Sequence, residues 1–117
     1  MTHVLMTFRT RSIHVIYLKE IKKKMAHLYI LRCADDSLYV GSTDDLETRL
    51  KRHKSGYAAD YTKLHAPVEL IYTEEYPTYK EAFNRERQLH KWSRAKKDAL
   101  IAGDIEKLKE LSKSKNK

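Results

Sequence analysis

The chain has 117 residues, 34% of them charged, and a formal net charge of +8. This length allows one domain with a modest core and excludes two. Its single cysteine, Cys33, excludes an internal disulfide, and the longest apolar run near the N-terminus, residues 13–18, is too short to cross a bilayer. We therefore expect a cytoplasmic protein that does not associate with membranes.

The positive charge is distributed unevenly. Residues 1–24 carry a net charge of +5, residues 25–102 only +1, and residues 103–117 +2. Within the middle segment, cations gather in residues 49–54 and 85–97. Such clusters can hold phosphates, although a solvated helix face explains them equally well. The nucleic-acid contacts predicted from these clusters are Arg49, Lys51, Arg52, Lys91, Arg94, Lys96 and Lys97.

Residues 1–24 differ in character from the rest, since they show no sustained amphipathic period and end in three lysines before Met25. We interpret them as an N-terminal extension, poorly ordered or upstream of a natural start at Met25. The alternative is a basic arm that grips nucleic acid. The predicted domain covers residues 25–103, and residues 104–117 form a C-terminal helix and basic tail.

The first elements of the domain predict a hairpin. Residues 27–32 have strand character, residues 34–37 form a turn, and residues 38–40 begin a second strand that ends at Gly41. A capping box with Asp44 or Thr43 as the cap then starts a helix that runs to about Lys54. Residues 57–66 read as a polar loop, and a third strand follows Pro67.

The second half of the domain is helical. Residues 78–81 form another capping box, which starts a helix to about Lys91, and Ser93 caps a helix that ends at Gly103. Asp104 caps a last amphipathic helix. The order β-β-α-β-α-α predicts an α/β (α+β) fold in which helices flank a three-stranded antiparallel sheet.

Polar side chains occupy positions where a core would place apolar ones. In the helix from Asp44, Arg49 and His53 share the stripe of Leu46 and Leu50. A buried guanidinium needs a partner, which is either a structural carboxylate or an anionic ligand such as phosphate.

Glu86 repeats this anomaly in the helix from Thr78, where Ala82, Phe83 and Leu89 mark the predicted inner face. An inward carboxylate there either pairs with Arg49 or binds a metal. One carboxylate, with water and substrate phosphate completing the shell, is a normal arrangement for Mg²⁺. Tyr29 and Tyr39 face the same way only if the hairpin register allows it, and strand tyrosines are more often core residues.

These residues together resemble the GIY-YIG nuclease family, in its small single-domain bacterial branch. The first motif reads His27-Leu28-Tyr29, without the leading glycine of the family, and the second reads Tyr39-Val40-Gly41. Arg49, His53 and Glu86 follow in the family's order and spacing. Asp98 stands where other members carry an asparagine.

The resemblance implies a Mg²⁺-dependent endonuclease that hydrolyses DNA phosphodiester bonds, directed by DNA structure and connected with DNA repair; Mn²⁺ is a possible substitute. It implies that Glu86 holds the metal and Arg49 the scissile phosphate. Tyr39 orients or deprotonates the attacking water, with Tyr29 supporting it and His53 as an auxiliary group. The expected partner is DNA, bound by a monomer or weak dimer.

Two other function classes stay open at this point. One is a non-catalytic nucleic-acid-binding module with the same fold and a basic face. The other is a structural domain in which Arg49 and Glu86 simply form an ion pair. Dependence on Mg²⁺ separates the nuclease from the binding module, and salt-dependent DNA binding separates the binding module from the structural domain.

Overall fold

A computed structural model of the chain describes residues 25–55 and 65–115. The strands are β1 (Ala26–Cys33), β2 (Leu38–Thr43) and β3 (Val68–Tyr76), and the helices are α2 (Leu46–Ser55), α4 (Tyr79–His90), α5 (Arg94–Ala102) and α6 (Ile105–Lys115). The predicted N-terminal extension and most of the predicted loop at residues 57–66 lie outside the described residues. In the part that is described, no helix is long and apolar enough to span a membrane.

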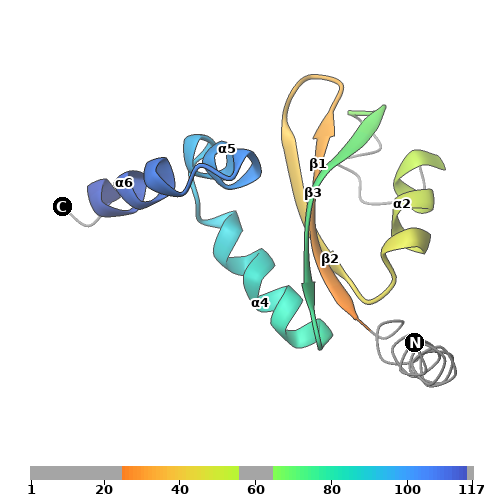
Figure 1. Ribbon diagram of the computed structural model, residues 1–117. Coiled ribbons are helices and arrows are strands. Elements are labelled where there is room, and N and C mark those ends of the chain that lie inside the picture. The colour runs from red at the N-terminus through yellow and green to blue at the C-terminus, as the bar shows by residue number, and fades with distance from the viewer. Residues whose placement is uncertain (1–24, 56–64, 116–117) are drawn as a thin grey trace, which may run out of the picture.

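The three strands form one antiparallel sheet in the order β2-β1-β3, with β1 in the centre. Helix α2 covers one face of this sheet and α4 lies against the opposite face; α5 packs against the core on the side of α4, and α6 extends away from the sheet (Figure 1). This arrangement confirms the predicted fold class and element order.

The turn between β1 and β2 is closed by short-range hydrogen bonds. Cys33 N donates to Ser37 O over 2.9 Å, and Ser37 N donates to the side chain of Asp35 over 3.0 Å. Asp36 takes a left-handed conformation with φ of 70°, which aspartate tolerates better than most residues. The hairpin therefore follows from the turn residues that predicted it.

The helix ends mostly follow the predicted capping signals. Thr78 Oγ1 accepts from Glu81 N, Ser93 Oγ accepts from Lys96 N, and Gly103 ends α5 in the left-handed conformation with φ of 73°. The predicted cap of α2 was wrong by one residue. Asp45, rather than Asp44 or Thr43, accepts from Thr48 N over 3.2 Å.

The core lies between the sheet and α4. Leu28 and Ile30 of β1, Val40 of β2 and Leu89 of α4 are all buried and in one cluster. The prediction that Phe83 belongs to this inner face was wrong, because it is 39% exposed. Each residue turns a helix by about 100°, and this turns Phe83 away from the direction of its neighbour Ala82, which is buried.

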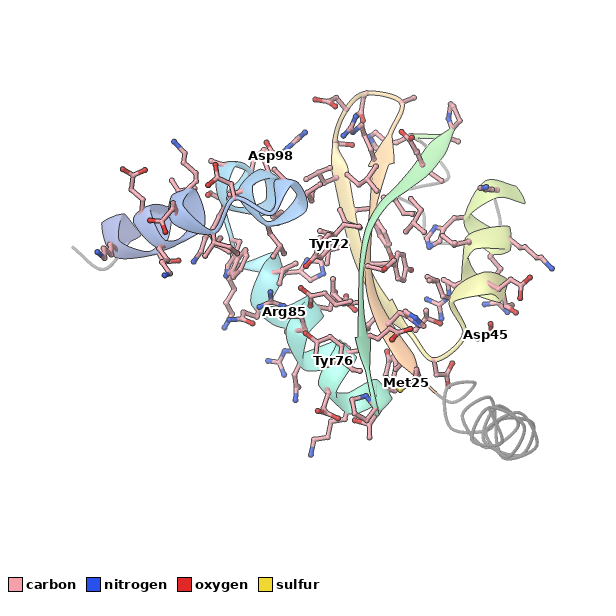
Figure 2. All side chains as sticks on the ribbon, in the orientation of Figure 1. Met25, Asp45, Tyr72, Tyr76, Arg85 and Asp98 are labelled. Atoms are coloured by element: carbon pink, nitrogen blue, oxygen red, sulfur yellow. The ribbon has the colours of Figure 1, made fainter. Side chains whose placement is uncertain are left out.

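A second, polar cluster fixes α4 against β3. Arg85 donates from Nε to Glu74 Oε1 (2.9 Å) and from Nη2 to Glu74 Oε2 (3.1 Å). Tyr72 and Tyr76 donate their hydroxyl groups to the same carboxylate over 2.6 and 2.7 Å. Figure 2 shows Tyr72, Tyr76 and Arg85 on the side of the sheet that α4 covers. Every oxygen of Glu74 is thus satisfied.

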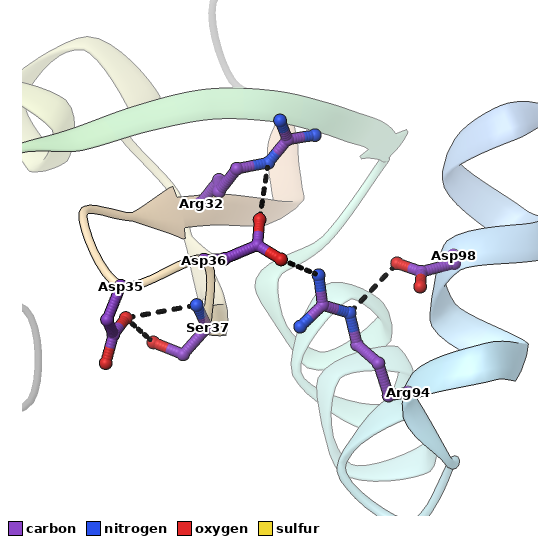
Figure 3. Close-up of polar contacts among 6 residues, drawn as sticks. All are labelled: Arg32, Asp35, Asp36, Ser37, Arg94 and Asp98. Atoms are coloured by element: carbon purple, nitrogen blue, oxygen red, sulfur yellow. Dashed lines mark hydrogen bonds and ion pairs between the residues drawn. The ribbon is translucent and has the colours of Figure 1, made fainter.

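Charged side chains also join the β1–β2 turn to α5 (Figure 3). Asp36 accepts from Arg94 Nη2 over 3.3 Å and lies 3.8 Å from Arg32 Nε, while Arg94 Nε donates to Asp98 over 3.0 Å. All four side chains are at least 46% exposed, so each pair contributes little stability by itself. The network nevertheless occupies two nitrogens of the Arg94 guanidinium.

Candidate active site

The register of the hairpin brings Tyr29 and Tyr39 to the same face of the sheet. Tyr29 pairs with Gly41, and Tyr39 pairs with Leu31. Because side chains alternate along a strand and residues paired across strands share a face, both phenols project to the side that α2 covers. Their ring centroids are 6.3 Å apart.

Gly41 is needed because the ring of Tyr29 crosses directly over it. A Cβ atom at this position would lie 2.5 Å from Tyr29 Oη and 2.6 Å from Cζ. Any larger residue would displace the phenol or the strand. The glycine of the second motif therefore creates the space in which Tyr29 is buried, with none of its surface exposed.

His53, on helix α2, contacts both tyrosines. His53 is 1% exposed, and its Nε2 forms a hydrogen bond of 2.9 Å with Tyr29 Oη. Its ring also lies edge-on to Tyr39, with 5.2 Å between the centroids. Burial, reinforced by the charge of Arg49, lowers the pKa of His53, so the imidazole is neutral at neutral pH.

The pKa values of both phenols are raised. Burial, followed by the neighbouring Tyr39, raises the pKa of Tyr29 to about 12. Burial and the negative charge of Glu86 raise the pKa of Tyr39. Arg49 opposes both shifts through its positive charge, so Arg49 and Glu86 both lie close enough to act on the two tyrosines.

Glu86 projects from α4 and contacts β2. Its Oε1 accepts a hydrogen bond of 2.5 Å from Ser42 Oγ, and its Oε2 lies 3.1 Å from Nε2 of His90. Within residues 25–55 and 65–115, Arg49 and Glu86 form no ion pair, in contrast to the structural-domain hypothesis; the carboxylate of Glu86 contacts His90.

A cleft of about 280 Å³ opens beside these groups. It is lined by Leu38, Tyr39, Val40, His90 and Lys97. Tyr39 is partly exposed while Tyr29 is fully buried. Of the two phenols, Tyr39 is therefore the one that solvent reaches.

The donor set suits a hard cation that keeps most of its water. No group of three or more His, Cys, Asp or Glu side chains in the described residues is arranged to hold a metal. Glu86 alone offers one carboxylate beside an open cleft. That matches the way Mg²⁺ and Mn²⁺ bind together with substrate phosphates.

The predicted DNA contacts lie in different surroundings. Lys51 and Arg52 are exposed on α2, Lys91 is exposed at the end of α4, and Lys97 lines the cleft. Lys96 is only 9% exposed and lies 4.4 Å over the Trp92 ring, and Arg94 is bound to Asp36 and Asp98. In the structure, Lys97 lies in the cleft beside Tyr39, whereas Lys96 and Arg94 contact other side chains of the protein.

Two residues near the site were missed in the sequence. His90 lies four residues after Glu86, a spacing that places both on one side of a helix and that would have indicated the contact. Ser42 gave no such signal, because it meets Glu86 only through the packing of α4 on β2, 44 residues away.

Comparison with known proteins identifies the family of this fold. Residues 25–98 match the GIY-YIG catalytic domain. A UPF0213 protein of Bacillus pumilus is 46% identical over 81 residues, covering 69% of this chain and 83% of that protein. One from Natronomonas pharaonis is 41% identical over 67% of this chain and 92% of its own length. A solution NMR structure of an E. faecalis protein aligns with a TM-score of 0.50 and 37% identity, covering 70% of this chain and 88% of that one.

Proposed function

Because the chain belongs to the GIY-YIG catalytic-domain family, we propose that it is an endonuclease that hydrolyses DNA phosphodiester bonds with Mg²⁺ or Mn²⁺. The observation that carries this proposal is that five side chains from four elements interact, either by direct contact or through their charges. They are Tyr29, Tyr39, Arg49, His53 and Glu86.

Arg49 binds the scissile phosphate in this proposal. In the part of the chain that the structure describes, no carboxylate forms an ion pair with it, while its charge acts on Tyr29, Tyr39 and His53. A guanidinium with such surroundings has donors for two parallel hydrogen bonds to phosphate oxygens.

Tyr39 is the proposed base, and Glu86 controls its basicity. The negative charge of Glu86 is one of the causes that raise the pKa of Tyr39. Glu86 would hold a divalent cation, whose positive charge would lower the pKa of Tyr39 and stabilise negative charge on the leaving oxygen. The Tyr39 phenolate would take a proton from the attacking water as the oxygen of that water bonds to phosphorus, and the P–O ester bond breaks with its electron pair going to the leaving oxygen.

Tyr29 and His53 are buried neighbours of Tyr39 and position its ring. Tyr29 has no exposed area, so its hydroxyl cannot contact a substrate. Its hydrogen bond to His53 fixes the imidazole against the ring of Tyr39. The neutral imidazole provides a polar neighbour for Tyr39 without adding a positive charge to the site.

Contacts to the DNA backbone are assigned to the cations around this centre. We place Lys97 nearest to the reacting phosphate because it shares the cleft with Tyr39. Lys51, Arg52 and Lys91 extend the basic surface on α2 and α4. Phosphate contacts position DNA without reading its sequence, so we expect selection by DNA structure, as in repair.

The test is cleavage of branched, nicked and flapped DNA by the full chain, with Mg²⁺ or with chelator. Glu86→Gln and Arg49→Ala should each lower the cleavage rate by at least about 10²-fold, because each removes a charge that acts in the transition state. Glu110→Gln and Lys109→Ala on α6 are matched controls that remove the same kinds of charge away from the site.

Folding of each variant is checked by circular dichroism. Metal-dependent cutting that survives in Glu86→Gln would contradict the assigned metal ligand. Absence of cutting, together with DNA binding that weakens steeply with salt, would favour the binding module instead.

A further inference from the structure

The carboxylate of Glu86 is held at both oxygens, but by groups of very different mobility. Ser42 donates to Oε1 from β2 and is only 4% exposed. His90 contacts Oε2 from the next turn of α4, and its side chain is 53% exposed. One partner is therefore locked into the sheet, and the other can rotate into water.

The cost of losing each contact differs for the same reason. If Glu86 left Ser42, a buried hydroxyl would lose its acceptor, which is unfavourable because no water replaces it. If His90 left Glu86, its ring nitrogen would find water, and an exposed pair of this kind contributes little. A ligand that competes for the carboxylate will therefore displace His90 and leave Ser42 in place.

The two oxygens also face different surroundings. His90, which contacts Oε2, is one of the residues that line the cleft beside Tyr39. Oε1 is directed to Ser42 on β2. The oxygen held by the mobile partner is thus the one next to the cleft.

We propose that Ser42 is a positioning residue that fixes Oε1 of Glu86, and that His90 occupies the cation position on Oε2 until a divalent cation displaces it. The proposal rests on the proposed function, because it takes Glu86 as the metal ligand. It adds a role for two residues: Ser42 favours metal binding, and His90 competes with the metal.

The test measures Mn²⁺ affinity of the full chain by the electron paramagnetic resonance signal of free Mn²⁺, with no DNA present. Ser42→Ala should raise the dissociation constant about 10- to 100-fold, as loss of a hydrogen-bond partner of a metal ligand does elsewhere. Ser42→Thr keeps the hydroxyl and should restore affinity. His90→Ala should bind Mn²⁺ more tightly than the wild type, because the competing side chain is gone.

The opposite directions expected for Ser42→Ala and His90→Ala separate this proposal from a simple structural tether, which would lower the melting temperature without changing affinity. Glu86→Gln identifies the site. If Glu86→Gln removes a site that Ser42→Ala leaves intact, the positioning role is overturned and the nuclease proposal stands. If no Mn²⁺ site depends on Glu86, both proposals fail.

Discussion

Tyr39 and Tyr29 share a neighbour in His53 but differ in access to solvent. Tyr39 lines the cleft, and Tyr29 is completely buried over Gly41. We expect Tyr39→Phe to lower the cleavage rate by about 10²- to 10⁴-fold, the usual contribution of a general base. Tyr29→Phe loses one hydrogen bond and should cost about tenfold.

The pH dependence identifies the base. The pKa of Tyr39 is raised in the protein without metal, so the wild-type rate should climb with pH as this phenol loses its proton. That increase should persist in Tyr29→Phe and disappear in Tyr39→Phe. Rates from single-turnover cleavage between neutral and alkaline pH measure it, and equal activity of Tyr39→Phe and wild type would exclude Tyr39 as the base.

At this scale the sequence predicted the buried position of His53 but not the contacts of the site residues, and Arg49 and Glu86 are only partly buried. Arg49, His53 and Glu86 were recognisable because polar groups appeared at apolar positions of a helix. The direction of Tyr39 depended on the hairpin register, and the contact of Ser42 with Glu86 depended on how α4 packs. Neither is encoded within a few residues of the side chain concerned.

Among the elements, α4 depends on Glu74 for its attachment to β3. Burial alone would raise the pKa of Glu74, but hydrogen bonds from Arg85, Tyr72 and Tyr76 outweigh burial and lower it. A carboxyl group whose pKa is lowered by folding stabilises the fold at pH values above its ordinary pKa of 4.5. This stabilisation is lost as the pH falls through the pKa of the folded state.

We therefore expect the wild-type free energy of unfolding to fall as the pH drops below 4.5. Glu74→Gln should lose about 2–3 kcal/mol at pH 7, because Arg85 loses its counter-charge, and should lack this part of the acid dependence. Urea unfolding at pH 7 and in acid measures both effects. Glu75→Gln is the matched control, since Glu75 is exposed on the same strand. An acid dependence as large in Glu74→Gln as in wild type would show that other carboxyl groups cause it.

The elements themselves were largely predictable because their signals are local. Thr78 with Glu81, Ser93, and Gly103 define helix ends through bonds within four residues. Phe83 was misplaced because the width of a buried helix face depends on what packs against it, which a periodic pattern does not specify.

Over the whole molecule, the distribution of ion pairs decides which cations are available to DNA. Arg94 is held by Asp36 and Asp98, whereas Lys97 lies in the cleft. Lys97→Ala should reduce the slope of log K against log salt by about 1, the effect of losing one phosphate contact. Arg94→Ala should leave that slope unchanged.

Fluorescence anisotropy of labelled DNA over a salt series, without divalent cation, gives the two slopes. Lys109→Ala on α6 serves as the control for the loss of one positive charge. An equal decrease in Arg94→Ala and Lys97→Ala would mean that the ion pairs of Arg94 open when DNA binds.

Arg85 and Glu86 are consecutive on α4, yet Arg85 contacts Glu74 on one edge strand and Glu86 contacts Ser42 on the other. A helix turns by about 100° per residue. One residue inserted between β3 and α4 would therefore place an arginine opposite Ser42 and move the carboxylate out of the site. The length of this short connection therefore determines which side chain of α4 faces Ser42 and which faces Glu74.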